Sequence, residues 1–281
     1  MKFLTGLVIL CLMVACAPSK PLTIQRDQPR PMLAPAKIQP SAILPPPVAP
    51  AREAFAPMRV TAKEISGITF EGVAFDSRSA VLKVADQAGG PGTQFPDAAA
   101  AGRALGGSAA INAGFFTPEG APLGLVVAGG NTSGRWNGSS SLGSGVWALD
   151  AAGASAISRR EKLGRAVAGR MRELIQAGPL LVENGGAVAG LEATKTSARI
   201  AILWNGGSQW WIGRASPCTL AAFSQAISLG NPAGWKARQA LNLDGGRSAD
   251  LWISAEVSGG PITHRTVWNR PVRNFLVLKK L

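Results

Sequence analysis

A carboxylate stands at the end of an apolar strand pattern near the C-terminus of the chain. The segment ALNLDGGRSADLWI, residues 240–253, delivers Asn242 and Asp244 to a Gly245-Gly246 turn. Glycines at a strand end allow a ligand to approach the backbone closely. An aspartate there can act as a general base, but Asp-Gly is also a common turn sequence in which the carboxylate only caps the turn. The segment alone leaves both interpretations of Asp244 open.

Two further segments interrupt a strand pattern with glycine and polar residues. One is INAGFFTPEGAPLGLVV, residues 111–127, which contains Asn112 and Gly114, and the other is QAGPLLVENG, residues 176–185. All three segments are expected at strand ends, and loops at such places often carry binding and catalytic groups. The elements that deliver these loops therefore have to be strands.

Apolar residues at alternate positions, or in short runs, predict nine such strands. They cover residues 68–75, 79–84, 109–112, 123–127, 198–204, 209–212, 240–243, 251–254 and 274–278. Because strands outnumber helices and the helices interrupt them irregularly, we expect an α+β fold. Its architecture would be a mixed, strand-rich sheet with a few flanking helices in a single domain.

Two helices are predicted. The apolar spacing over residues 163–176 indicates one helix, which Gly178-Pro179 would end. Residues 219–229 form the second, with Ser216 as N-cap, Pro217 at the first helical position and Gly230 as C-cap. The charged run at 159–162 is interpreted as a solvated helix entrance, with an anion site as the alternative.

The first 16 residues have the order of a bacterial lipoprotein signal. Lys2 precedes an apolar run from Phe3 to Ala15, and the Met-Val-Ala-Cys ending is similar to a lipobox with Cys16 as the lipidated residue. The run is too short to cross a hydrocarbon core of roughly 30 Å as a helix. Ala17 is not the aspartate that signals inner-membrane retention, so we expect a lipid anchor in the outer membrane, facing the periplasm.

Proline dominates the stretch that follows. Residues 17–57 favour an extended polyproline conformation over a packed core, so we interpret them as a semi-rigid tether. An SH3-type ligand is the rarer alternative. Residues 58–281 have ordinary globular composition and enough chain for one core. The chain is thus divided into a signal (1–16), a tether (17–57) and a domain (58–281).

Cysteine and histidine are scarce. Cys11 would leave with the signal and Cys16 would be acylated, which leaves Cys218 as the only thiol of the mature domain and excludes an intrachain disulfide. Cys218 and His264, the sole histidine, are both interpreted as structural. Neither lies in a metal-ligand pattern, so no metal site is predicted and the sequence requires no cofactor.

The formal net charge of the chain is +13 at pH 7. This much positive charge favours an anionic partner, such as a phosphate-bearing glycan or a lipid headgroup. Nucleic acid is excluded as the partner, because an exported protein rarely meets it and the chain has no recognised nucleic-acid motif. The expected partners are therefore an anionic glycan or sugar phosphate, and the membrane through the lipid anchor.

The three polar segments, in this order, resemble the phosphodiester glycosidase family. The resemblance covers nearly the whole domain, and its most specific elements are NAGFF at 112–116 and NLDGG at 242–246. Supporting similarity is found in QAGPLLVENG, in TSARIAI at 196–202 and in NRPVRNFLVL at 269–278. One departure is Arg247, which stands where the family has a third glycine and predicts a narrower or more basic pocket mouth.

The resemblance implies cleavage of a sugar from a sugar-1-phosphodiester. The leaving group is a phosphate monoester with a second pKa near 6, so it departs with little protonation and needs no histidine acid. Asp244 would activate water or stabilise the sugar cation. Arg199 in TSARIAI, and secondarily Arg247, would hold the phosphate, because a guanidinium can grip two of its oxygens.

The remaining candidates bind rather than catalyse. Asn112 and Asn242 would orient sugar or phosphate oxygens, with turn stabilisation as the alternative, and an edge-strand surface charge is the alternative for Arg199. The other predicted substrate-binding residues are Gly114, Gly245, Gly246 and Ser248. Three further carboxylates are interpreted as structural, the last two also serving as reserve candidates: Glu119, Glu183 and Asp250.

A competing hypothesis from another class uses the same basic groove. A noncatalytic envelope module could bind anionic glycan or peptidoglycan and use the tether for reach. A third hypothesis is a structural partner in an export or polysaccharide assembly complex. The enzyme and the binding module differ in whether any turnover depends on Asp244.

Overall fold

The computed structural model of the protein describes residues 55–281. The predicted signal, the lipidation site Cys16 and nearly all of the 17–57 tether lie outside the described residues, and these three assignments stay predictions. Among residues 55–281, no helix combines the length and the apolar character that a membrane span requires.

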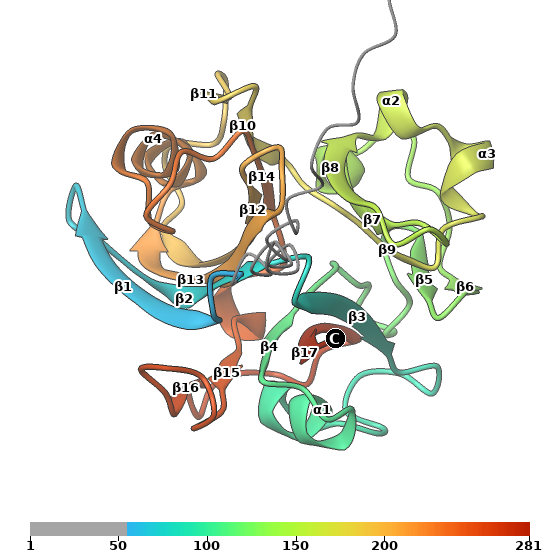
Figure 1. The fold of residues 1–281 in the computed structure, drawn as a ribbon. Helices are drawn as coiled ribbons and strands as arrows, with labels where there is room; N and C mark the ends of the chain where they lie inside the picture. The colour runs from blue at the N-terminus through green and yellow to red at the C-terminus, as the bar shows by residue number, and fades with distance from the viewer. Residues whose placement is uncertain (1–54) are drawn as a thin grey trace, which may run out of the picture. The chain divides into compact units, whose positions relative to one another are not determined.

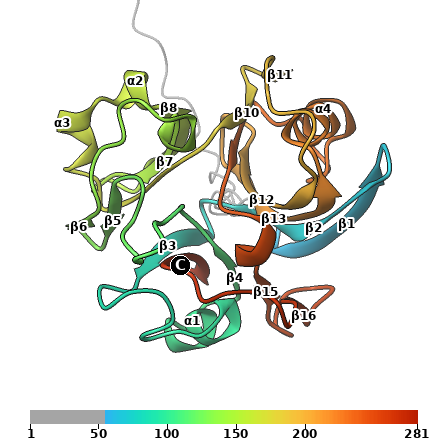
Figure 2. The same ribbon diagram turned by 180° about the vertical axis from the view of Figure 1, so that it is seen from behind.

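Three antiparallel sheets make up the fold (Figures 1 and 2). The first sheet has the order β1 (Arg59–Ile65), β2 (Ile68–Asp76), β13 (Gln209–Cys218), β12 (Ser197–Trp204), β14 (Gln239–Asn242), β10 (Leu180–Glu183) and β11 (Gly186–Ala187). The second has the order β16 (Ile262–His264), β15 (Leu251–Ile253), β4 (Ala109–Asn112), β17 (Asn274–Lys280) and β3 (Ala80–Asp86). The third has the order β6 (Asn131–Ser133), β5 (Val126–Ala128), β9 (Glu173–Ala177), β7 (Gly145–Leu149) and β8 (Ser155–Arg159).

The main hydrophobic core draws on all three sheets. Trp210 of the first sheet, Leu276 of the second and Trp147 of the third are each about 1 % exposed or less and belong to one cluster of buried side chains. Burial of apolar surface contributes roughly 25 cal/mol per Å², so this shared cluster ties the sheets to one another. The strand ends that meet beside it are consequently held in fixed positions.

Four α-helices cover outer faces of the sheets in residues 55–281. Helix α4 (Leu220–Gly230) packs on the first sheet through Phe223 and Ile227, and α1 (Ala98–Ala104) lies against β4, β15 and β17 (Figure 1). The short helices α2 (Arg160–Leu163) and α3 (Arg165–Ala168) follow β8. The fold is thus strand-rich as expected, but it is closer to a mostly-β fold than to an evenly mixed α+β fold.

The predicted helix at 219–229 is confirmed, although its caps were predicted wrongly. Thr219, not Ser216, is the N-cap, and its side chain accepts a hydrogen bond from the Ala222 amide. Ser216 and Pro217 instead belong to β13, because strand pairing continues to Cys218. Gly230 is the last helical residue, and Asn231 adopts the left-handed C-cap conformation with φ of 50°.

The predicted helix at 163–176 is wrong. Only two short helices, α2 and α3, form here, and the chain then enters β9 in the middle of the third sheet. The spacing of Leu174 and Ile175 suited a helix face, but both side chains are buried by sheet packing instead. Glu173 opens this strand, and its carboxylate accepts bonds from Lys83 Nζ and the Val84 amide, each at 3.1 Å. Tertiary pairing therefore overrides the local periodicity.

Candidate active site

Strand register brings Asp244 beside Arg199. β12 and β14 are antiparallel, with Asn242 opposite Ala201, and the Leu243 amide continues the pairing by donating to the Ile200 carbonyl at 2.9 Å. Two residues beyond Asn242, Asp244 therefore lies level with Arg199 at the start of β12. The Asp244 amide then donates to the Ala113 carbonyl at 2.9 Å, which links this strand end to the end of β4 in the second sheet.

A cleft of about 220 Å³ opens at this junction. Four of the predicted site residues line it: Arg199, Asn242, Asp244 and Gly245. Its other walls come from Phe115 in the NAGFF segment, from Gly178-Pro179, from Ser197, Leu220 and Leu243, and from Leu142. Segments far apart in the sequence thus meet in one cleft, and Asp244 is the one carboxylate among its lining residues.

The Asp244 carboxylate is buried without full compensation. Its side chain is 9 % exposed, and Oδ2 makes no hydrogen bond. Burial raises the pKa of Asp244 above its ordinary value, opposed by a hydrogen bond with Ser248, by the charge of Arg270 and by the Gly245 backbone. An under-satisfied carboxylate with a raised pKa in a cleft is a candidate functional group.

Arg270 is the cation nearest to this carboxylate. Its Nη2 lies 3.7 Å from Asp244 Oδ2, and its Nε donates to the Ser248 hydroxyl at 3.1 Å. The guanidinium lies over the ring of Phe116, 4.6 Å from the centroid. Our sequence reasoning missed Arg270 as a site residue. The signal was present, since Arg270 lies in the NRPVRNFLVL segment and Phe116 in NAGFF, but no local spacing joins the two.

Arg199 carries a positioned charge into the cleft. Its Nε donates to the Cys218 carbonyl at 2.9 Å and its Nη2 to the Lys195 carbonyl at 2.8 Å. These partners are neutral, and no salt bridge within 4 Å is found for this guanidinium among residues 55–281. A guanidinium fixed by carbonyls keeps its charge available to an anion.

The two predicted asparagines take different positions. Asn242 lines the cleft, its Nδ2 donating to the Gly178 carbonyl at 2.9 Å while its Oδ1 is buried without a partner. Asn112 is fully buried and does not line the cleft. Its Nδ2 donates to the Asp244 carbonyl at 2.6 Å and its Oδ1 accepts from the Asp250 amide at 2.9 Å. Asn112 therefore holds both ends of the loop that carries Asp244, in line with its turn-stabilising alternative.

The glycines of the site are required by packing. A Cβ on Gly245 would lie 2.4 Å from the Ala198 carbonyl oxygen, and Gly246 has φ of +60°. The turn lies directly against β12 at Gly245 and has a left-handed backbone at Gly246. Each of these features favours glycine over a residue with a Cβ. The Gly114 amide donates to Asn274 Oδ1 at 2.7 Å and fixes the end of β4.

Arg247 and Ser248 follow in the short 3₁₀ helix η2 (Gly246–Ser248) and point to different surroundings. Ser248 is fully buried between Asp244 and Arg270. Arg247 is exposed and lines a second cleft, not the one that contains Asp244. The structure therefore does not place Arg247 at the mouth of the first cleft, where the sequence predicted it.

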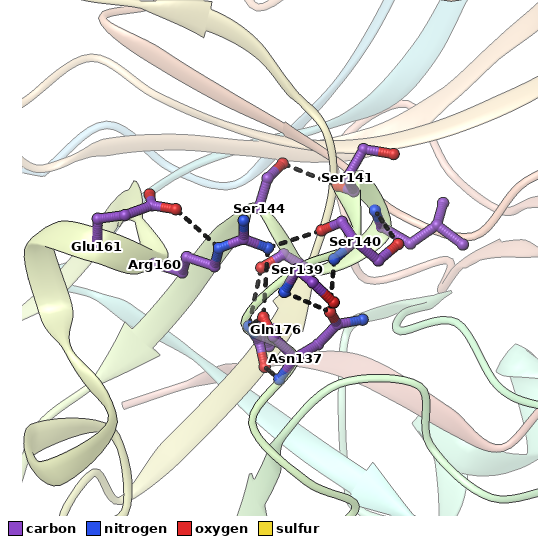
Figure 3. Close-up of polar contacts among 10 residues, drawn as sticks. Asn137, Ser139, Ser140, Ser141, Ser144, Arg160, Glu161 and Gln176 are labelled. Atoms are coloured by element: carbon purple, nitrogen blue, oxygen red, sulfur yellow. Dashed lines mark hydrogen bonds and ion pairs between the residues drawn. The ribbon is translucent and has the colours of Figure 1, made fainter.

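A hydrogen-bonded loop supports the side of the cleft that Leu142 lines (Figure 3). Gln176 Nε2 donates to the Asn137 and Gly143 carbonyls, each at 2.8 Å, and its Oε1 accepts from the Asn137 amide at 2.9 Å. Arg160 Nη1 donates to the Ser140 carbonyl at 2.7 Å. This network fixes the turn at η1 (Ser141–Gly143), which carries Leu142.

The charged run at 159–162 is not simply a solvated helix entrance, and Figure 3 shows the contacts of one of its residues, Arg160. A helix does begin at Arg160, but the Arg160 side chain is only 15 % exposed and supports the loop. Arg159 makes a bidentate pair with Glu183, with Nη2 to Oε2 at 2.6 Å. This pairing lowers the pKa of Glu183. The run is thus structural at its first two positions, and Glu183 lies outside the cleft.

The other reserve groups also have structural partners. Asp250 is buried, accepts from the Ala98 amide at 2.9 Å and pairs with Arg265 at 2.7 Å. His264 contacts Glu71. Cys218 is buried, which raises the pKa of its thiol. Among residues 55–281, no three His, Cys, Asp or Glu side chains gather as a metal site would require.

The raised pKa of Asp244 predicts a gain in stability when its charge is removed. A folded-state pKa above the unfolded value means that ionised Asp244 costs stability above the folded pKa, and that this cost fades as pH falls toward about 3.9. Asp244→Asn is therefore expected to unfold at a higher temperature than the wild type at pH 7, with the difference shrinking toward pH 4. Thermal unfolding followed by circular dichroism measures it.

The matched control has the opposite sign. Asp76 is fully buried and accepts bonds from Arg78, Ser208 and Gln209, which hold its pKa at about 2. The stability that ionised Asp76 contributes is present above the unfolded pKa and is lost as pH falls toward about 2. Asp76→Asn should therefore unfold at a lower temperature than the wild type at pH 7. A loss of stability in both variants would contradict the burial argument for Asp244.

Strand ends of the three sheets thus bring a carboxylate and guanidinium groups together, and the sequence places the chain in a defined family. The family model described as phosphodiester glycosidase matches residues 106–279, and the chain belongs to this family. The predicted resemblance is thereby confirmed.

Two solved structures share the fold at low identity. The catalytic domain of zebrafish N-acetylglucosamine-1-phosphodiester alpha-N-acetylglucosaminidase, auto-inhibited by its pro-peptide, aligns with a TM-score of 0.55 and 15 % identity, over 80 % of this chain and 82 % of that one. A hypothetical protein from Synechocystis aligns with a TM-score of 0.55 and 18 % identity, over 79 % of this chain and 61 % of the other. No curated protein sequence matches the chain.

Proposed function

We propose that this protein is an exported hydrolase that cleaves a sugar from a sugar-1-phosphodiester in an envelope or exopolysaccharide glycan. Family membership supports a hydrolase of this general class. The observation that carries the proposal is the single lining carboxylate of a cleft that also holds Arg199, a guanidinium positioned by backbone carbonyls and without a salt bridge within 4 Å in residues 55–281. The name of the zebrafish relative describes the same bond type.

The charge pattern suits a leaving group that is already acidic. Many glycosidases need a second carboxylate, because an alcohol must be protonated as it departs. A phosphate monoester has a second pKa near 6 and departs as an anion. A cleft with one lining carboxylate and a nearby cation is therefore sufficient for this bond, whereas an ordinary glycoside would lack its acid.

Each residue then has a defined task. Asp244 takes a proton from water or stabilises the sugar cation, and its raised pKa brings it nearer to the pH range where a base is effective. Arg199 binds the phosphate and stabilises its growing charge as the C–O bond breaks. Arg270 orients Asp244 and keeps it ionised. Asn242 lines the cleft and helps to orient the sugar.

We further propose that the lipid at Cys16 anchors the mature protein in the outer membrane and that residues 17–57 hold the domain off the surface. This location would bring the cleft to glycans of the cell envelope. The proposal rests on the signal-like sequence before Cys16 and the proline content after it.

A panel of sugar-1-phosphodiesters tests the activity. We expect the purified protein to release free sugar and a phosphate monoester from at least one of them, and to leave the matching neutral glycosides intact. Phosphorus NMR follows the conversion of diester to monoester. Binding without turnover on every member of the panel would instead favour the noncatalytic envelope module.

A further inference from the structure

A second cleft lies on the other side of the Gly245-Gly246 turn. It has a volume of about 310 Å³, and its lining includes the basic residues Arg214, Arg247, Arg265 and His264 together with Ala198 and Gly246. Ser197 and Gly245 line the first cleft, so the two clefts are one residue apart along both β12 and the turn. The two clefts therefore lie on either side of the start of β12 and the turn that packs on it.

Two of the four basic groups in the second cleft, Arg214 and Arg247, make no salt bridge within 4 Å in residues 55–281. Arg265 pairs with Asp250, and His264 contacts Glu71. Arg247 donates from Nε to the Trp268 carbonyl at 3.0 Å, and no salt bridge within 4 Å is found for it in the described part of the chain. The positive charge of this cleft therefore exceeds its negative charge.

Arg214 is the more informative of the two. It projects from β13, is partly buried, and has neither a hydrogen bond nor a salt bridge from its side chain among residues 55–281. Burial lowers the pKa of Arg214, and the charge of Glu71, which stands opposite Arg214 on β2, opposes this shift. Removing an unpaired cation from water is costly, and an anion bound in the cleft would offset that cost.

An exposed tryptophan, Trp268, is linked to the same cleft through its backbone. Trp268 is 75 % exposed, and its own carbonyl is the one that accepts from Arg247. The turn that presents it is fixed, since Thr266 Oγ1 donates to Asn269 Oδ1 at 2.7 Å and Asn269 Nδ2 donates to the Ala249 carbonyl. The exposed face of this ring is available to pack against a ligand.

We propose that this second cleft, named here the arginine cleft, binds an anionic group of the glycan beyond the scissile bond. Arg214 and Arg247 grip its phosphate or carboxylate, and Trp268 packs against the adjoining sugar ring. The inference rests on the proposed function in assuming that one ligand spans both clefts. It makes the substrate a polyanionic glycan with at least one further negative group, not an isolated sugar phosphodiester.

Binding is measured in the Asp244→Asn protein, so that no probe is cleaved during titration. Three probes are titrated by calorimetry: tetragalacturonate, which carries carboxylates, a glycerol phosphate tetramer, which carries phosphates but no sugar rings, and neutral cellotetraose. We expect at least one anionic probe to bind at least tenfold more tightly than cellotetraose. The two anionic probes separate carboxylate from phosphate as the recognised group.

Substitutions then locate the bound probe. Arg214→Gln and Arg247→Gln should each lower the affinity for this probe about tenfold, in line with the loss of a charge-assisted hydrogen bond. Arg170→Gln removes the same charge from an exposed position outside both clefts and should change the affinity less than twofold. If tetragalacturonate binds, Trp268→Ala should weaken its binding. The same substitution should not weaken binding of the glycerol phosphate tetramer, which has no sugar rings. Because Arg247 is exposed, its variant remains informative if Arg214→Gln fails to fold.

The inference is overturned if neither anionic probe binds better than cellotetraose, or if Arg170→Gln weakens binding as much as the cleft variants do. These outcomes are distinguishable from failure of the proposed function. A protein without phosphodiester turnover can still bind the anionic probes through the arginine cleft, and a protein with turnover can still fail to bind them.

Discussion

Asp244→Asn is expected to reduce turnover of a sugar-1-phosphodiester by about 10²–10⁴-fold while leaving the fold intact. The amide keeps the size and hydrogen-bonding capacity of the side chain, but it can neither accept a proton from water nor balance a sugar cation. Substrate affinity should change little, because the lost interaction forms only in the transition state. Steady-state kinetics measure this, with circular dichroism to confirm folding.

Glu183→Gln is the matched control for that experiment. Glu183 is a carboxylate bound to Arg159 outside the cleft, so its neutral variant should retain near wild-type kcat. Asp250→Asn tests the other reserve carboxylate, which is tied to Arg265 and the start of α1. Turnover that persists in Asp244→Asn would remove this carboxylate from the mechanism and promote one of the other two.

Substitutions of Arg199 and Arg270 are expected to differ in kind. Arg199→Ala should lower kcat/KM on a phosphodiester by about 10²–10³-fold, because both the bound phosphate and its growing charge lose a partner. Its affinity for a neutral glycan should not change. Arg199 is not among the groups that shift the pKa of Asp244, so the pH dependence of kcat/KM should keep its position.

Arg270→Gln should move that pH dependence. The groups acting on Asp244 are Ser248, the Gly245 backbone and Arg270, and the charge of Arg270 lowers the pKa of the carboxylate. Without this charge the pKa of Asp244 rises. A base that must be ionised then stays protonated, and inactive, up to a higher pH. The acid limb of the kcat/KM profile should therefore shift upward in Arg270→Gln. An unshifted limb would mean that Arg270 does not control the ionisation of the catalytic group.

The strands of the site could be predicted because burial on both faces leaves a continuous apolar run. Residues 109–112 and 240–243 match β4 and β14 to within one residue, and the Asp244 segment lies at a strand end as expected. The helix predicted over 163–176 failed for a complementary reason. Leu174 and Ile175 are buried by neighbouring strands, and a pattern that fits two periods is decided only by its tertiary partners.

Side-chain direction was the part that local sequence could not supply. Asn112 and Asn242 occupy similar strand ends, yet one is enclosed by backbone groups of the loop 244–250 and the other faces the cleft. Arg270 and Arg247 were harder still. The roles of both depend on how the chain returns to the Gly245-Gly246 turn at Arg270, 20 residues after Asp250. No spacing in the sequence predicts that return.

The most direct test of the central claim is the position of the bond that breaks. Hydrolysis of an active sugar-1-phosphodiester in water enriched with oxygen-18 separates the two possibilities, with mass spectrometry of the sugar and phosphorus NMR of the phosphate monoester as readouts. If Asp244 directs water to the sugar carbon while Arg199 holds the leaving phosphate, the label enters the sugar and the monoester remains unlabelled. Label in the phosphate monoester would mean attack at phosphorus, and would contradict the account.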